Sequence, residues 1–253
     1  MLTTNDRFRS LPFVQDSELR EAATNHGYHR DAGSADGWLF FGSYTVDGEI
    51  ALAASPTHWF VAVEHPGVAA ELSAERVGPA PGSCRAFVFN DQTEMRAALS
   101  RIYQLSLSLP TAPLKHFEDE VAMLGATEAE AIARRRIGQD VFRRALMEYW
   151  QGRCPITGIG DPALLRASHI IPWAECESDA ERLDVHNGLL LSALWDAAFD
   201  HALASFDDEG RPVFSPLLSD TARQALVWQA PLPLTDAHRA RLSRHRARLE
   251  VGR

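Results

Sequence analysis

Short runs of aromatic and β-branched residues dominate the first hundred positions, and such runs are typical of β-strands. Strands are predicted at residues 37–46, 59–64 and 84–90, and Asp47-Gly48 indicates a tight hairpin turn before a further strand at 49–54. Helical spacing predicts helices at residues 16–25, 68–75 and 91–107. This pattern is typical of a mixed α/β domain over residues 1–108.

A second region follows a short polar segment that contains two prolines. Residues 106–113 read SLSLPTAP, which is the best candidate for a linker. Thr127 can cap a long helix that runs to about Trp150 and stops near Gly152. Its expected apolar face consists of Ile132, Ile137, Val141, Phe142, Leu146 and Tyr149. We therefore expect two domains, residues 1–108 and 109–253, and an α+β fold class.

Composition sets limits on the class of protein. The chain has 253 residues and 45% hydrophobic residues, the proportion of an ordinary globular protein. We expect no membrane span, since no run approaches about 20 apolar residues, and a cytoplasmic location, since the N-terminus lacks a signal-peptide core. The three cysteines are widely spaced and odd in number, so a disulfide framework is not expected.

The formal net charge is −9, yet the basic residues are clustered. One group lies on and just beyond the predicted long helix, and a second lies near the C-terminus at residues 239–248. Such clusters can contact phosphates even in an acidic protein, or they can form local salt bridges on a solvated helix face. Both interpretations remain open for each cluster.

The residues that indicate chemistry lie within residues 153–216. His169 ends an apolar, strand-like run and is a candidate general base, although a buried core histidine is the alternative. Asn187-Gly188 suits a turn in which the amide holds the histidine-bearing loop. Asp196 and Asp200 are one helical turn apart, so both lie near one face, where a carboxylate can bind a hard divalent cation.

These residues occur in ordered segments that read ASHIIPW, RLDVHNGLLLSALWDAAFD and SFDDEG, preceded by RIGQDVFRRALMEYWQGRCPITG. The stretch from about residue 136 to 216 resembles the HNH endonucleases, also called the ββα-metal or His-Me finger group. Within that group, it is similar to the C-terminal nuclease domain of modification-dependent restriction endonucleases. The resemblance implies a ββα-metal nuclease domain with flanking helices behind the mixed α/β domain. It also implies that His169 is the general base, Asn187 the central asparagine and Asp196 a metal ligand.

The chain departs from the pattern of that group at two places. Many members have an aspartate before the base histidine as a second metal ligand, whereas this chain has Ser168. The second ligand to the expected Mg²⁺ (or Mn²⁺) is therefore open among Asp200, Asp184 and the Ser168 hydroxyl. Many members also have two cysteine pairs that bind zinc. The equivalent positions in this chain are Cys154, Thr157, Ser192 and Trp195. Because they include only one thiol, we predict no structural zinc.

The function expected from this resemblance is metal-dependent cleavage of double-stranded DNA, with restriction of modified or foreign DNA such as that of phage. Phosphate contacts are expected from Arg136, Arg143, Arg144, Arg153 and Arg166. Target recognition is expected from N-terminal aromatic residues that could stack on a base, among them Trp38, Tyr44 and Trp59, although core packing is the alternative for at least half of these aromatics. A homodimer is possible because double-strand cleavage uses two sites. Two rival functions are a nuclease effector or toxin with a partner-binding N-terminal domain, and a non-catalytic DNA-binding protein with a decayed site.

Overall fold

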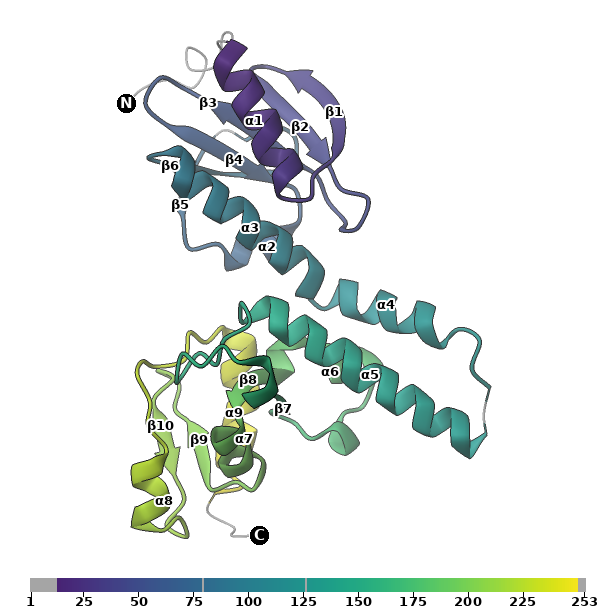
Figure 1. The fold of residues 1–253 in the computed structure, drawn as a ribbon, viewed down its shortest axis with the longest axis vertical. Coiled ribbons are helices and arrows are strands. Elements are labelled where there is room, and N and C mark those ends of the chain that lie inside the picture. The colour runs from purple at the N-terminus through teal and green to yellow at the C-terminus, as the bar shows by residue number, and fades with distance from the viewer. Residues whose placement is uncertain (1–12, 79, 126, 250–253) are drawn as a thin grey trace. The chain divides into compact units, whose positions relative to one another are not determined.

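The computed structural model describes residues 13–78, 80–125 and 127–249, and the chain divides into two compact units, residues 1–107 and 108–253. Helices are combined with mostly antiparallel strands, which confirms the predicted α+β class (Figure 1). Within the described residues, none of the helices has the length and apolar character that crossing a bilayer requires. Each unit is described below by itself.

The first unit is built on a six-stranded antiparallel sheet with strand order β1-β2-β3-β4-β6-β5. Its strands are β1 (Arg30–Ala35), β2 (Trp38–Gly42), β3 (Ile50–Ala54), β4 (Trp59–Val63), β5 (Glu75–Val77) and β6 (Arg85–Phe89). Its helices are α1 (Phe13–Asn25), α2 (Pro66–Glu71) and α3 (Gln92–Ser108). Figure 1 shows α1 and α3 lying across one face of the sheet.

The central strands form because both of their faces can be buried. In β3 all five residues are buried, and Leu52, Val61 and Phe87 stand next to one another across β3, β4 and β6. Alternation then places Ala53, Phe60 and Val88 on the opposite face. One face thus carries large apolar side chains, while the other mixes alanines with a few rings.

Two predicted features of the first unit and its boundary are wrong in detail. Strand β2 ends at Gly42 and β3 begins at Ile50, so Asp47-Gly48 lies within a longer loop rather than forming a tight turn. The expected linker at residues 106–113 is largely helical, since α3 continues to Ser108 and α4 (Thr111–Val121) starts three residues later. Pro110 fits there because it precedes the first turn of α4, where a missing N–H removes no helical hydrogen bond.

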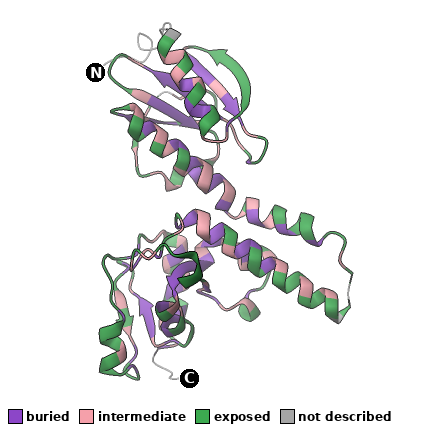
Figure 2. Cartoon of the chain, in the orientation of Figure 1, coloured by how far each residue is buried: buried purple, intermediate pink, exposed green. Residues whose placement is uncertain are grey.

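The second unit begins with α4 and the long helix α5 (Glu128–Tyr149), which pack against each other. Thr127 caps α5 through a capping box with Glu130, as its position in the sequence suggested. Only the C-terminal half of α5 is buried, and the exposed colouring of its N-terminal half is visible in Figure 2. Ile132 was therefore wrongly placed on the apolar face, because it precedes the buried part of the helix and is 65% exposed.

The centre of the second unit is a strand pair followed directly by a helix: β7 (Leu165–His169), β8 (Gly188–Ser192) and α7 (Ala193–Asp200). A second antiparallel pair, β9 (Ala204–Phe206) and β10 (Pro212–Phe214), comes next along the chain. The remaining helices are α6 (Asp179–Leu183), α8 (Asp220–Ala225) and α9 (Asp236–Arg246), and single turns of 3₁₀ helix lie at Pro162–Leu164, Trp173–Glu175 and Val185–Asn187. The ββα arrangement fixes where the candidate catalytic residues lie.

Candidate active site

The candidate residues come together at one end of the β7–β8 pair. In its register, Ser168 pairs with Leu189 and His169 pairs with Gly188. Ser192 ends β8 and is the N-cap of α7, so no loop separates the strand from the helix. Asp196 lies in the first turn of α7 and Asp200 is its last residue. A buried strand therefore positions both carboxylates relative to His169.

The imidazole of His169 has a defined orientation. Its ring stacks on Phe142 of α5 with 3.8 Å between ring centroids, and Trp173 contacts it edge-on at 5.6 Å. Nε2 lies 2.9 Å from the carbonyl oxygen of Arg182. Because a carbonyl can only accept, Nε2 carries the proton and Nδ1 keeps its lone pair in the neutral ring.

Burial determines the protonation state of His169. Its pKa lies below the ordinary histidine value because burial disfavours the imidazolium, and the hydrogen bond to Arg182 and the charge of Asp200 only partly oppose this effect. The ring is therefore neutral at pH 7 and can accept a proton at Nδ1.

Asn187 is fully buried and acts on the chain that follows His169. Its Oδ1 accepts a hydrogen bond of 2.8 Å from the Ile171 backbone N–H, and its Nδ2 donates to the carbonyls of Ile171 and Glu181, each at 3.3 Å. The Asn187 carbonyl also accepts from the Ile170 N–H at 2.9 Å. Asn187 thus fixes the exit of β7 against α6, which makes it a positioning residue rather than a group that meets substrate.

Ser168 and Asp196 are in direct contact. Ser168 Oγ donates a hydrogen bond of 2.6 Å to Asp196 Oδ1, and Ser168 is buried. The pKa of Asp196 is raised above the ordinary aspartate value, first by burial and also by the nearby charge of Asp200, whereas the Ser168 hydrogen bond, Arg166 and His201 act in the opposite direction. Asp200 itself is exposed. The pair of carboxylates creates a local excess of negative charge.

This donor set suits a hard divalent cation. Two carboxylates and one hydroxyl offer only oxygen ligands, the type that Mg²⁺ prefers. A cation would offset the burial that chiefly raises the Asp196 pKa and the repulsion from Asp200 that adds to it. Among the described residues, no three His, Cys, Asp or Glu side chains gather into a metal-binding group. The Ser168 hydroxyl and water would therefore complete the coordination of an ion held by Asp196 and Asp200.

Asp184 is not available as the second metal ligand. Its Oδ2 accepts a hydrogen bond of 2.6 Å from Arg241, and its Oδ1 lies 2.9 Å from His186 Nδ1. Both carboxylate oxygens are thus occupied, Oδ2 in a partly buried ion pair with Arg241 of α9 and Oδ1 in the contact with His186. This corrects one of the three alternatives raised from the sequence and leaves Asp200 and Ser168.

The arginines expected to bind phosphate differ in their surroundings. Arg143 donates 2.8 Å hydrogen bonds to the carbonyls of Leu165 and Pro162, so it fixes the start of β7 and is not free for phosphate. Arg144 forms a 2.8 Å ion pair with Glu120, while Arg153 and Arg166 are exposed and bond only to nearby carbonyls. Arg136 is exposed on α5. Arg136, Arg153 and Arg166 remain the candidates for contact with DNA.

The three proposed recognition aromatics also differ. Trp38 is only 5% exposed and packs against Phe60 in the core of the first unit, so its ring cannot stack on a base; this corrects its assignment. Tyr44 is 78% exposed and Trp59 is half-buried at the start of β4. Strand alternation accounts for the burial of Trp38, because this residue lies on the same face of the sheet as Phe60, against which it packs.

Sequence reasoning missed two residues that support the site. Arg182 supplies the carbonyl that fixes the His169 tautomer, and its guanidinium donates to the carbonyls of Trp173 and Cys176 at 3.2 and 2.6 Å. Phe142 supplies the stacking surface and had been read only as an apolar helix position. Arg182 acts on His169 through its backbone carbonyl, which every residue type has, so the sequence gives no signal for this role. The apolar position of Phe142 on the helix could be inferred from the sequence.

Packing occupies the region where related domains are expected to bind zinc. Cys154 is a buried free thiol, and Trp195 is buried against Phe206 with its indole N–H donating 2.9 Å to the Val227 carbonyl. Thr157 and Ser192 have hydroxyls, which are poor zinc ligands compared with thiolates. The expected absence of a structural zinc stays a prediction.

The ββα segment of the second unit resembles a known family of nucleases. Residues 154–207 match the family model of HNH endonucleases, and this segment contains β7, β8, α7 and every candidate catalytic residue. A comparison with curated proteins found no match. The chain thus contains a segment similar to HNH endonucleases, which supports nuclease activity.

Proposed function

We propose that this protein is a metal-dependent endonuclease that hydrolyses phosphodiester bonds in double-stranded DNA and restricts modified or foreign DNA. The observation that carries the proposal is the pairing of a neutral, tautomer-fixed His169 with the Ser168–Asp196 contact at the end of one strand. A base and a cation-binding carboxylate are the two functions that phosphodiester hydrolysis requires.

The chain's own part in the reaction begins at His169 Nδ1. That nitrogen accepts a proton from water as the water attacks phosphorus, the bond from phosphorus to the leaving sugar oxygen breaks, and that oxygen takes a proton from solvent. The ring is held for this by Phe142 stacking and the Arg182 carbonyl. The resulting imidazolium is stabilised by the charge of Asp200, which acts to raise the His169 pKa. Asn187 keeps the backbone after His169 in place throughout.

Asp196, Asp200 and Ser168 would hold the cation. When bound, a divalent cation stabilises the charge that develops on the phosphoryl oxygens. Arg166 lies on β7, and its positive charge acts to lower the pKa of nearby Asp196. It is therefore suited to contact the phosphate of the DNA substrate. Exposed Arg136 and Arg153 would contact the DNA backbone without reading its sequence.

Target choice is assigned to the first unit, residues 1–107, since every candidate catalytic residue lies in residues 108–253. Of the three aromatics expected to recognise the target, exposed Tyr44 and half-buried Trp59 are still able to contact DNA.

Cleavage of plasmid DNA tests the proposal. Supercoiled plasmid should be nicked or linearised with Mg²⁺ or Mn²⁺ and remain intact with EDTA, and DNA from a modifying host should be cut in preference to unmodified DNA. Equal cleavage of both substrates would reject restriction of modified DNA while leaving the nuclease intact. Binding without cleavage under every metal tested would instead favour the non-catalytic alternative.

A further inference from the structure

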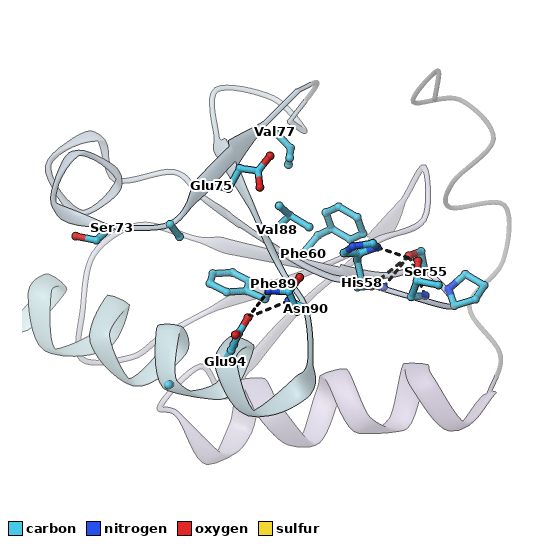
Figure 3. Close-up of a pocket in the computed structure, with 14 residues that line it drawn as sticks. Ser55, His58, Phe60, Ser73, Glu75, Val77, Val88, Phe89, Asn90 and Glu94 are labelled. Atoms are coloured by element: carbon cyan, nitrogen blue, oxygen red, sulfur yellow. Dashed lines mark hydrogen bonds between the residues drawn. The ribbon is translucent and has the colours of Figure 1, made fainter. Parts of the chain in front are cut away.

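The first unit contains a pocket of about 890 Å³ that the nuclease chemistry does not use. It lies where β4, β5 and β6 meet the loop at residues 55–58 and the first turns of α3 (Figure 3). Pockets of about 300–1,000 Å³ hold small organic ligands in proteins. The lining residues that carry the argument are Ser55, His58, Phe60, Glu75, Asn90 and Glu94.

The floor of the pocket is a row of neighbouring side chains on one face of the sheet. Phe60 of β4 pairs with Val88 of β6, which in turn pairs with Glu75 of β5. Residues paired in this way point to the same face, so an aromatic ring, an aliphatic side chain and a carboxylate follow one another across three strands. Figure 3 shows them on the same side of the sheet, with the His58 ring beside Phe60. The centroids of the His58 and Phe60 rings are 6.5 Å apart.

The opposite side of the pocket carries polar groups in defined positions. Glu94 Oε2 accepts hydrogen bonds from the Asn90 backbone N–H at 3.0 Å and from Asn90 Nδ2 at 3.2 Å. These bonds fix the carboxylate at the start of α3. His58 is likewise oriented by a 2.8 Å hydrogen bond between its Nδ1 and Thr57 Oγ1. The carboxylates of Glu75 and Glu94 therefore approach the pocket from two different elements.

The charge of the lining selects the ligand. Among the described residues that line the pocket, two have carboxylates and none is a lysine or an arginine, so this lining would repel a phosphate or a carboxylate ligand. Ionised carboxylates only accept hydrogen bonds, so they favour a ligand with N–H donors. The ring of His58, which is exposed, and the side chain of Val88, which is half-buried, offer a surface to a flat, uncharged heterocycle, while Phe60 lies buried next to them.

We propose that this pocket binds a nucleobase with an exocyclic amine, cytosine, adenine or guanine, presented by a nucleotide rotated out of the DNA. The inference rests on the proposed function, since DNA is the substrate that supplies such bases. Cytosine offers its N4 amine, adenine its N6 amine and guanine its N2 amine to the carboxylates, whereas thymine has no exocyclic amine and presents O4, an acceptor that they repel. The pocket exceeds the size of a bare base, which leaves room for the sugar or for a substituent on the base.

Binding of free nucleosides to the full-length chain tests this inference. Backbone amide shifts would be followed by NMR during titration with 2′-deoxycytidine, 2′-deoxyadenosine, 2′-deoxyguanosine, thymidine and inorganic phosphate, each to millimolar concentration. The Asp196→Asn variant is used so that binding is measured independently of cleavage. We expect saturable shifts around the pocket for the three nucleosides with an exocyclic amine, and binding of thymidine weaker by roughly tenfold or more.

Variants with altered carboxylates make the test specific. Glu75→Gln and Glu94→Gln keep the side-chain size but add an N–H donor, so each should weaken 2′-deoxycytidine binding and reduce its preference over thymidine. Asp47→Asn, which changes an exposed carboxylate outside the pocket, should have no effect. Equal binding of thymidine, binding of phosphate, or no binding of any nucleoside would overturn the inference. If these results accompanied intact plasmid cleavage, the proposed nuclease function would still stand.

Discussion

Ser168 and Asp196 are 28 residues apart in the chain, and the hydroxyl of the first donates a 2.6 Å hydrogen bond to the carboxylate of the second. The contact joins the end of β7 to the first turn of α7. Where related nucleases are expected to have a second carboxylate, this chain has the neutral hydroxyl of Ser168, which donates to one oxygen of Asp196 and thereby orients it. Of the three candidate ligands Ser168, Asp196 and Asp200, the two that carry negative charge therefore both lie on α7.

Asp196→Asn should abolish metal-dependent cleavage while the fold is kept, because the amide retains the Ser168 contact but not the charge that holds a cation. Plasmid cleavage over a Mg²⁺ titration would measure this, with Asp140→Asn on the exposed face of α5 as a matched control. Activity in Asp196→Asn equal to that of the control would exclude Asp196 as a ligand.

His169→Ala should reduce cleavage by about two or more orders of magnitude, the usual contribution of general acid–base catalysis. DNA binding should persist, and His29→Ala, an exposed histidine of the first unit, should cleave normally. The lowered His169 pKa also predicts that the acidic limb of the pH–rate profile lies below about pH 6.5, since the ring is already neutral above it. A limb centred above pH 7 would contradict this assignment.

Gly188→Ala should damage the site through packing. A Cβ at this position would lie 2.4 Å from Phe142 Cζ, so the ring on which His169 stacks must move. Overpacking of this kind destabilises a fold by about 1–3 kcal/mol. Urea denaturation would measure the loss, and cleavage by the folded fraction should fall as well. Unchanged stability and activity would show that Phe142 does not hold the imidazole.

Acid should weaken the second unit through His245. This histidine is buried between Ser205 Oγ and the Phe199 carbonyl, and burial lowers its pKa to about 4. Between the unfolded value of about 6.5 and that folded value, the unfolded chain binds a proton that the folded chain does not. The free energy of unfolding should therefore fall as the pH drops from 6.5 toward 4, by about 3 kcal/mol over the whole range.

Urea denaturation at pH 7.5 and pH 4.5 would detect this effect. A His245→Gln variant, which cannot titrate, should lose less stability between the two pH values than the unaltered chain. Equal losses would mean that His245 does not control the acid response.

A fragment of residues 108–253 should retain weak, unselective, metal-dependent nicking, because it contains the site and α4 together with α5. Starting at Lys115 would instead remove the first turn of α4, which packs on α5. Circular dichroism would establish folding, and binding should weaken steeply with salt, as phosphate contacts do. Retention of the full chain's target preference would contradict the assignment of recognition to residues 1–107.

The sequence predicted the local structure around the candidate site better than it predicted the long-range contacts of the site's residues. His169 and Asp196 could be placed because strand and helix periods and the order of the motif constrain them. Asp184 could not be excluded, since the arginine that pairs with it lies 57 positions further along the chain. For the same reason Arg143 was read as a phosphate contact, although its hydrogen bonds go to backbone carbonyls. Long-range pairing decides whether a charged side chain is free, and periodicity carries no information about it.

Helix α5 contacts β7 at both of its ends: Arg143 bonds the Leu165 carbonyl at the start and Phe142 stacks on His169 at the finish. Because Phe142 and Arg143 are neighbours in α5, one short stretch of the helix contacts both ends of the strand. A displacement of this stretch would therefore move the start of β7 and the imidazole of His169 together.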